Sequence, residues 1–205
     1  VKLAFENSIS SLKAAGHMVD PVSFEFLAYV VPTYYILTMA EASSNLARYD
    51  GVHYGYRSKR AFDLESTYKT SRSEGFGPEV KRRIVLGTFV LSAGYYDAYY
   101  IQAQKVRSLI KAEFDKIFEN SDLILSPVAP TTAPKFGSYS NALEMYLADI
   151  YTIGVNLAGL PAISLPVAKD KEGLPIGLQL IANSYEEQTL FDGALSMEKA
   201  VKYTK

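Results

Sequence analysis

Three side chains in this 205-residue sequence are of the types needed to hold a free α-amino acid. Such a ligand is a zwitterion, so its carboxylate needs a cation and its ammonium needs a carboxylate, each through charge-assisted hydrogen bonds. Arg83 begins an expected helix beside a Gly-rich segment, Asp149 lies shortly before Asn156, and Tyr34 lies on an earlier expected helix. These residues predict a zwitterion site. The alternative is three separate solvated side chains, because single surface charges are usually just hydrated.

The sequence offers no recognisable nucleophile to accompany such a site. The Ser-x-x-Lys spacing begins at Ser10 and at Ser108, but both occurrences lie on the polar sides of expected amphipathic helices, without companion motifs. His17 and His53 have no obvious partner carboxylates, which argues against a Ser-His-Asp triad, and they are too far apart to suggest a local metal pair. Phosphate-binding and dinucleotide-binding glycine motifs are absent. We therefore expect neither a catalytic residue nor a metal or cofactor site in this chain.

Two loops next to expected strands could form part of a pocket. The apolar segments 156–166 and 173–181 predict a hairpin of buried strands, with Asn156 just before the first strand at a Gly/Pro turn. The Pro-rich segment 126–134 follows a short strand at 123–125. Polar side chains and loops at strand ends often build pocket walls. A plain core hairpin and a plain linker are the alternatives, and spacing alone favours the plain hairpin.

Composition limits the class of protein. Apolar residues make up 48% of the chain and the net charge is -1, so a core is possible and an autonomous nucleic-acid binder is disfavoured. There is no cysteine, no signal peptide and no apolar run of the roughly 18 residues that a membrane span requires. These features favour a cytoplasmic protein. Because Val1 is not an initiator Met and the pattern starts inside an element, we expect a fragment of a longer polypeptide.

Hydrophobic periodicity predicts interleaved helices and short strands, hence an α/β class with a mixed sheet. A brief strand is expected at 18–22, and 48–57 and 58–73 are expected to be a loop and a polar surface excursion. The expected helices are 5–15, 24–47 interrupted near Pro32, one beginning near Pro78, 99–117, 141–151 and 186–199.

Five segments together match a known family: SSNLARYDGVHYGYR (43–57), SEGFGPEVKRRIVLGTFVLS (73–92), GYYDAYY (94–100), DLILSPVAPTTAP (122–134) and NLAGLPAISLP (156–166). They resemble the amidase signature family and, within it, the glutaminase subunits of tRNA-dependent amidotransferases. The hairpin and the Pro-rich loop are common to many amidases, whereas YDGVHYGYR and SEGFGPEVKRR are specific to the glutaminase subunits. The resemblance covers nearly the whole chain.

The resemblance implies an α/β/α sandwich around a mixed sheet, incomplete in this chain, with residues 1–205 forming the C-terminal part of a single amidase domain. It also implies a Ser–cis-Ser–Lys triad within a Gly/Ser-rich signature that this sequence does not contain. The nucleophile, its partners and most of the oxyanion hole are therefore missing, and we expect the isolated chain to be inactive.

Substrate recognition is what the resemblance carries over. It implies that Arg83 pairs with the α-carboxylate of glutamine, Asp149 with its α-ammonium, and Tyr34 with the substrate through its hydroxyl. Arg82 and Tyr35 are the adjacent alternatives. The family further implies that ammonia passes to a partner subunit, which holds ATP and Mg²⁺ and amidates Glu-tRNA(Gln), often also Asp-tRNA(Asn). The expected protein partners are the B and C subunits of the amidotransferase, and tRNA is met through the complex.

Two other functions fit the same residues. The chain could be the C-terminal part of another amidase that acts on small or fatty amides, in which case an apolar tunnel would replace the zwitterion site. It could also be a non-catalytic interaction module, an interpretation favoured by the missing triad.

Overall fold

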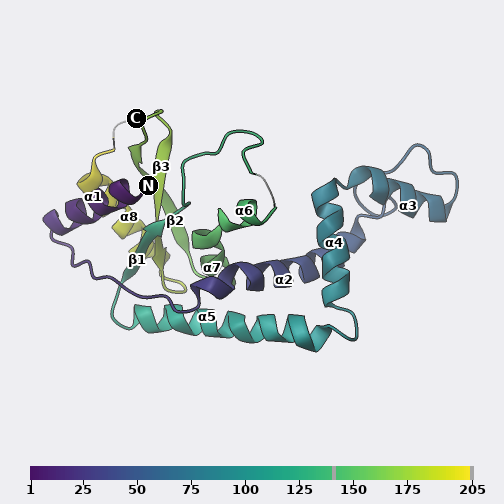
Figure 1. Cartoon of the computed structure of the whole chain (residues 1–205), viewed down its shortest axis with the longest axis horizontal. Helices are drawn as coiled ribbons and strands as arrows, with labels where there is room; N and C mark the ends of the chain where they lie inside the picture. Colours follow the sequence, from purple (N-terminus) through teal and green to yellow (C-terminus); the bar gives the residue numbers. More distant parts are fainter. Residues whose placement is uncertain (140–141, 204–205) are drawn as a thin grey trace. The chain divides into compact units, whose positions relative to one another are not determined.

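The computed structural model describes residues 1–139 and 142–203 and confirms the α/β class (Figure 1). The chain forms two compact units, whose boundaries fall within two helices. The first unit contains Val1–Val31 together with Arg107–Lys205, and the second contains Pro32–Val106.

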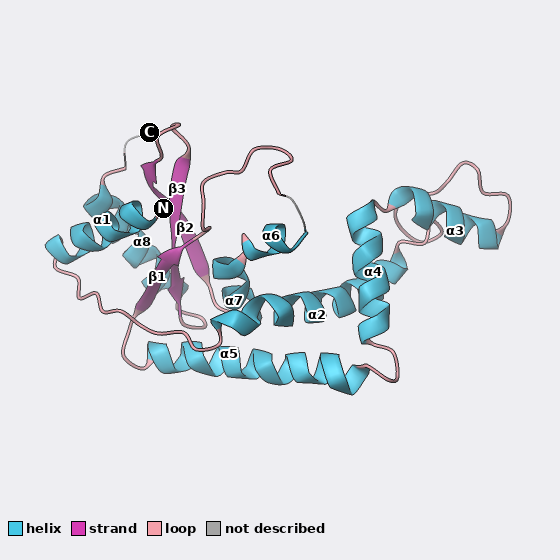
Figure 2. Cartoon of the chain, viewed as in Figure 1, coloured by secondary structure: helices cyan, strands magenta, loops and turns pink. Residues whose placement is uncertain are grey.

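The first unit is built on a three-stranded sheet, which contains every strand drawn in Figure 2. The strands are β1 (Leu123–Pro127), β2 (Ala162–Lys169) and β3 (Pro175–Ala182), in the order β1-β3-β2. The predicted β2–β3 hairpin is confirmed, with Ile163 opposite Leu180. Both strand pairs are antiparallel. The parallel pairing of a mixed sheet is thus not seen among the described residues.

Two helices from opposite ends of the chain cover this sheet. Helix α1 (Lys2–Ala14) and helix α8 (Glu187–Val201) contact each other, and α8 packs on β2 and β3. Leu190, Ala194 and Met197 of α8 point inward, as their spacing predicts, and join Leu178 of β3 in one apolar cluster. Leu178 is fully buried, so it lies at the centre of this core.

Three predictions in the first unit were wrong in detail. Residues 18–22 form no strand and pair with none; Met18 is 96% exposed, whereas Val19 packs against the core of this unit. The single helix expected at 141–151 is two helices, α6 (Ala142–Leu147) and α7 (Ile150–Ala158), and Asn141 lies outside the described residues. Asn156 does not precede a strand but lies within α7, which ends at Gly159 with a φ of 70°.

The second unit consists of helices and loops in its described residues. Helix α2 (Leu27–Asn45) enters it with Pro32 inside the helix, and a 3₁₀ turn (Leu46–Arg48) follows. Helix α4 (Pro78–Val90) begins at its proline, as predicted, because a first-turn residue needs no N–H donor. A π-helical turn (Tyr96–Ile101) then leads into α5 (Gln102–Phe118), the amphipathic helix predicted from periodicity.

Helix α3 (Leu64–Gly75) lies where the sequence predicted a polar excursion. Its first turn is closed by a capping box. The Asp63 carboxylate accepts the Ser66 N–H at 2.7 Å, and the Ser66 hydroxyl accepts the Asp63 N–H at 3.0 Å. The residues of this cap can be recognised in the sequence, but α3 lacks the apolar stripe from which helices were predicted.

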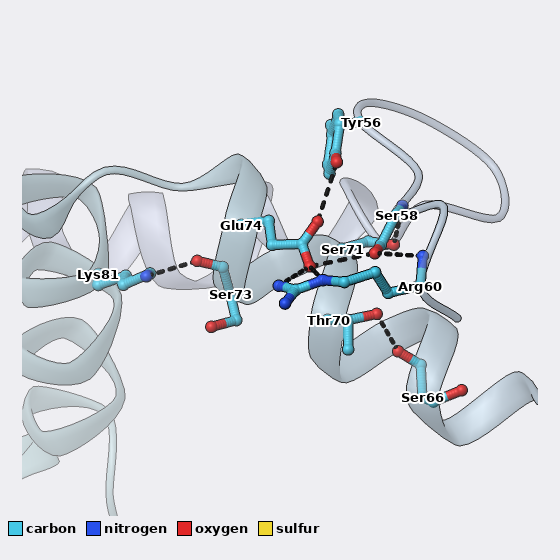
Figure 3. A network of polar contacts seen from close by, with 9 residues as sticks. All are labelled: Tyr56, Ser58, Arg60, Ser66, Thr70, Ser71, Ser73, Glu74 and Lys81. Carbon is cyan, nitrogen blue, oxygen red and sulfur yellow. Dashed lines mark hydrogen bonds and ion pairs between the residues drawn. The ribbon is translucent and has the colours of Figure 1, made fainter. Parts of the chain in front are cut away.

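Polar contacts hold the loop before α3 against that helix (Figure 3). The Glu74 carboxylate accepts hydrogen bonds from Arg60, from the Tyr56 hydroxyl at 2.9 Å and from the Ser58 hydroxyl at 3.1 Å. The Arg60 contact, followed by the Tyr56 contact, lowers the pKa of Glu74 below its ordinary value. The Ser71 hydroxyl accepts the Ser58 N–H at 3.0 Å, so two residues on one side of α3 bind the same loop residue.

A second carboxylate shapes the same loop from within. Asp50 is buried and accepts the N–H groups of Val52 and His53, both at 2.8 Å. Its other oxygen lies 2.8 Å from Nδ1 of His53. His53 therefore has a partner carboxylate that sequence inspection did not identify, and these contacts hold the pKa of Asp50 well below its usual range, the His53 side chain being the first cause.

Candidate functional site

Arg83 lies in the second turn of α4, where a neighbouring carboxylate binds it. Glu79, one turn earlier, accepts from Nε of Arg83 at 3.0 Å through one oxygen. Its other oxygen accepts from Nη1 of Arg82 at 2.9 Å. Spacings of three and four residues put these side chains on one face of the helix. One carboxylate therefore serves two guanidinium groups.

The same guanidinium lies over an aromatic ring from α2. The Arg83 Cζ atom is 5.9 Å from the centroid of the Tyr35 ring, within the range of a cation–π contact. The Tyr35 ring meets the Tyr34 ring edge-on, with centroids 5.3 Å apart. The structure thus connects the predicted residues Tyr34 and Arg83 through the alternative candidate Tyr35. It also distinguishes the two arginines, since Arg83 has the less exposed side chain, at 35% against 53% for Arg82.

A glycine lets α4 approach α2 closely, one turn beyond these side chains. A Cβ atom built on Gly87 would overlap the backbone carbonyl of Met39 and lie 2.8 Å from Cβ of Ser43. Met39 is one turn beyond Tyr35, just as Gly87 is one turn beyond Arg83. Figure 1 shows α4 crossing the later part of α2. Gly87 therefore sets the backbone separation at which Arg83 reaches the Tyr35 ring.

Asp149 belongs to the first unit and precedes α7 at its N-cap position. Its side chain is exposed and accepts no capping hydrogen bond, although an N-cap aspartate commonly does so. Helix α7, which follows Asp149, is held by side-chain hydrogen bonds to a carbonyl near each of its ends. Nε2 of the buried Gln179 donates to the Tyr151 carbonyl at 2.7 Å, and Nε of Arg107 donates to the Leu157 carbonyl at 2.8 Å.

The Pro-rich loop borders a hollow in the first unit, as the sequence suggested. The hollow has a volume of about 350 Å³ and is largely apolar. Asp149 is not among the residues that line it. The lining comprises Val1, loop residues Val128, Ala129, Thr131, Thr132 and Ala133, and strand residues Ser164, Pro166, Pro175, Ile176 and Gly177.

Tyr34, Tyr35, Arg82 and Arg83 all belong to the second unit, whereas Asp149 belongs to the first. Their roles stay predictions. Glu79 was not predicted as part of the site, although its three- and four-residue spacing to the arginines is visible in the sequence. Within residues 1–139 and 142–203, no three His, Cys, Asp or Glu side chains are grouped so that they could hold a metal ion. In the same residues, no helix is long and apolar enough to cross a membrane.

Comparison with known proteins places the sequence among amidases. Residues 1–191 match the family described as Amidase. The A subunit of glutamyl-tRNA(Gln) amidotransferase from Aliarcobacter butzleri is 62% identical over 205 residues, all of this chain and 45% of the relative. The protein of the same name from Sulfurimonas denitrificans is 61% identical over 203 residues, 99% of this chain and again 45% of the relative. The chain thus spans about half the length of the curated relatives it matches.

Solved structures agree with the sequence match. The crystal structure of the glutamyl-tRNA(Gln) amidotransferase A subunit from Thermotoga maritima is 38% identical, with a TM-score of 0.74 over all of this chain and 39% of that one. A structure described as an amidase shares the fold, with a TM-score of 0.75, 98% of this chain and 42% of that one covered, and 24% identity.

Proposed function

The chain belongs to the Amidase family, and from that membership we propose that it is the glutamine-recognition part of a subunit of a tRNA-dependent amidotransferase. The observation that carries this proposal is the 62% identity, over the whole chain, to a relative named as the A subunit of glutamyl-tRNA(Gln) amidotransferase. The larger protein hydrolyses glutamine and delivers ammonia to the B and C subunits, where ATP and Mg²⁺ support amidation of Glu-tRNA(Gln). This chain meets tRNA only through that complex.

Within this proposal the chain binds and orients the substrate. Arg83 pairs with the α-carboxylate of glutamine, Asp149 with its α-ammonium, and Tyr34 contacts it through the hydroxyl. The Ser–cis-Ser–Lys nucleophile is supplied by residues other than these 205. Fixing both charged groups of glutamine holds its side-chain amide at one position, and a fixed reacting group lowers the entropic part of the barrier.

Two structural observations support these roles. Two guanidinium groups, Arg82 and Arg83, share the Glu79 carboxylate beside a tyrosine pair, and such a pair of cations suits a carboxylate ligand. The Asp149 carboxylate is exposed and is not used to cap α7, which suits an ammonium group. A fatty amide carries neither charge, so the competing amidase function explains neither feature.

The test is a chimera in which this chain replaces the matching segment of the Aliarcobacter butzleri protein, assembled with that relative's B and C subunits. Arg83→Ala and Asp149→Ala should each lower kcat/KM for glutamine about 10- to 100-fold, mainly through KM, because each removes a charge-assisted hydrogen bond. Ammonia release at varied glutamine concentration measures the effect.

Lys171→Ala and Asp20→Ala are the matched controls, because each removes an exposed charge of the same sign from a loop. Both should leave KM within about twofold. Unchanged kinetics in Arg83→Ala and Asp149→Ala would remove those residues from the site. Turnover of a long-chain amide in preference to glutamine would favour the other amidase function, and turnover by the isolated 205-residue chain would reveal a nucleophile within it.

A further inference from the structure

We propose that Glu79 is a positioning residue, which holds the Arg83 guanidinium in the orientation needed to receive the substrate's carboxylate. This inference rests on the proposed function, since it gives Arg83 its ligand. Glu79 itself does not touch substrate. It acts through Arg83, and the geometry of α4 and α2 carries the proposal.

The first step concerns how a guanidinium is oriented. The group is planar, with its N–H donors around the edge and its π-system on the two faces. In this structure Glu79 binds the edge, at Nε, and Cζ lies over the Tyr35 ring, 5.9 Å from the ring centroid. The two contacts come from two different helices and together restrict how the group can turn. The Arg83 guanidinium therefore has fewer orientations open to it than an exposed arginine, which usually samples many rotamers.

The second step concerns charge. A carboxylate next to a substrate-binding arginine would ordinarily cancel its charge and weaken its hold on an anion. Here Arg82 also binds Glu79, at 2.9 Å, so the carboxylate is shared between two guanidinium groups. Glu79 can thus orient Arg83 without directing its whole negative charge at that group. On this basis Arg82 takes part of the charge of Glu79, and Arg83, which lies over the Tyr35 ring, binds the ligand.

The third step concerns the backbone. The Glu79 contact lies within α4, but the Tyr35 contact joins α4 to α2 and depends on how closely those helices pass. Gly87, one turn beyond Arg83, sets that separation, because it has no Cβ atom to collide with the Met39 carbonyl. The edge-on contact of Tyr35 with Tyr34 extends the arrangement to Tyr34, whose hydroxyl is proposed to contact the substrate. Glu79, Arg83, Tyr35 and Tyr34 form one continuous series of contacts.

The competing explanation is an ordinary helix-surface ion pair, because the Glu79 and Arg83 side chains are 36% and 35% exposed. Such pairs contribute little to stability and nothing to catalysis. The chain contains a matched example. Glu65 and Lys69 of α3 have the same four-residue spacing, with side chains 74% and 75% exposed, so the pair is open to water on most sides. This pair serves as the control.

The experiment uses the assembled chimera described above. Glu79→Gln keeps the shape of the side chain and removes its charge. We expect KM for glutamine to rise about tenfold, with kcat changed by less than about twofold. The interaction that is lost stabilises the bound ground state and the transition state equally, so its loss weakens binding without slowing the chemical step. Glu65→Gln should leave both constants unchanged. The thermal unfolding midpoints of the two variants should agree, which separates positioning from loss of fold.

A second readout reports the carboxylate directly. The enzyme with Glu79 should prefer glutamine over glutaminamide, in which the α-carboxylate is replaced by a neutral amide. Glu79→Gln should reduce that preference about tenfold, and Glu79→Gln combined with Arg83→Ala should be no worse than Arg83→Ala alone, because a positioning residue has no effect without its target.

The outcomes separate the inference from the function on which it rests. If Arg83→Ala raises KM while Glu79→Gln behaves like Glu65→Gln, then the positioning role is wrong and the binding role stands. If Arg83→Ala leaves KM unchanged, then the proposed recognition of glutamine fails first. A Glu79→Gln loss confined to kcat, with the preference for glutamine intact, would also overturn the positioning role.

Discussion

The two compact units bury different kinds of side chain. The first unit surrounds its sheet with apolar residues such as Leu178, Ile181 and Met197, and its buried polar residues are Ser8 and Gln179. In the second unit the buried apolar residues are Leu37, Met39, Ala40, Val90 and Ala103, and as many polar residues are buried beside them: Thr33, Asp50, Ser58, Thr67 and Ser71.

This difference shows that two sources of order operate within one chain. The first unit depends on removing apolar surface from water, which is non-directional. The second depends on hydrogen bonds between specific partners and on close backbone approach, which fail abruptly when one group is changed. Among the described residues, no buried side-chain nitrogen or oxygen lacks a partner, so the polar unit meets the requirement that makes such burial tolerable.

The largest expected effect follows from emptying the apolar core. Leu178→Ala should lower the free energy of unfolding by about 2–5 kcal/mol, because Leu178 is fully buried and the cavity left behind cannot fill with water favourably. Urea denaturation followed by far-UV circular dichroism measures it. Leu195→Ala, on the 54%-exposed position of α8, should change that free energy by less than about 0.5 kcal/mol. Equal losses would mean that the sheet is not the main core.

The next largest effect should come from added volume in the second unit. Gly87→Ala places a methyl group against the Met39 carbonyl, and a backbone atom cannot move aside as a side chain does. We expect about 1–3 kcal/mol of destabilisation. Amide hydrogen exchange should show it as faster exchange in α2 and α4, with the sheet unaffected. Gly94→Ala is the control, since nothing lies within 4 Å of its added Cβ. Similar exchange in both variants would refute the close helix contact.

The same contrast explains what the sequence could predict of the fold. The β2–β3 hairpin and the inward face of α8 were predicted, because apolar residues recur there with the period of the element that forms. Helix α3 was missed because its order comes from the Asp63–Ser66 cap and from the Glu74 contacts, which have no apolar period. The strand expected at 18–22 does not form: Met18 and Val22 are exposed, and Val19 packs against the core from a segment that pairs with no strand.

The candidate site likewise contains residues that the sequence could predict and contacts that it could not. The residue types of Arg83, Asp149 and Tyr34 could be proposed from chemistry and from the family resemblance. The Glu79 contact follows from helical spacing and could have been predicted. The Tyr35 ring beneath Arg83 and the Gly87 approach to Met39 join residues about 48 positions apart in the chain. Such pairs depend on how two helices cross, which local patterns do not encode.

The smallest expected effect concerns the pH dependence of the polar unit. The hydrogen bonds from Arg60 and then Tyr56 lower the pKa of Glu74 below its ordinary value of 4.5, which it recovers when the chain unfolds. The ionised carboxylate therefore holds the loop against α3 fully above pH 4.5, and this contribution is lost as the pH falls through the lower, folded pKa. Water screens part of the effect, because the Glu74 side chain is 22% exposed. Acidification should thus release Tyr56 before the sheet unfolds.

Nuclear magnetic resonance of the Tyr56 ring, followed from about pH 7 to about pH 3, can test this release. The natural chain should show a transition below pH 4.5, whereas Glu74→Gln should show the released signal at every pH. The comparison with the variant is needed because Asp50 and Asp63 of the same unit also have lowered pKa values.

Asp170 provides the contrast in the first unit. The Thr132 hydroxyl and then the Leu174 N–H lower the pKa of Asp170, but this residue closes a turn beside an apolar core. Its protonation should leave the amides of β3 protected. If the β3 amides lost protection at the same pH at which Tyr56 is released, the two units would respond to acid together. The division between a polar and an apolar unit would then not extend to stability.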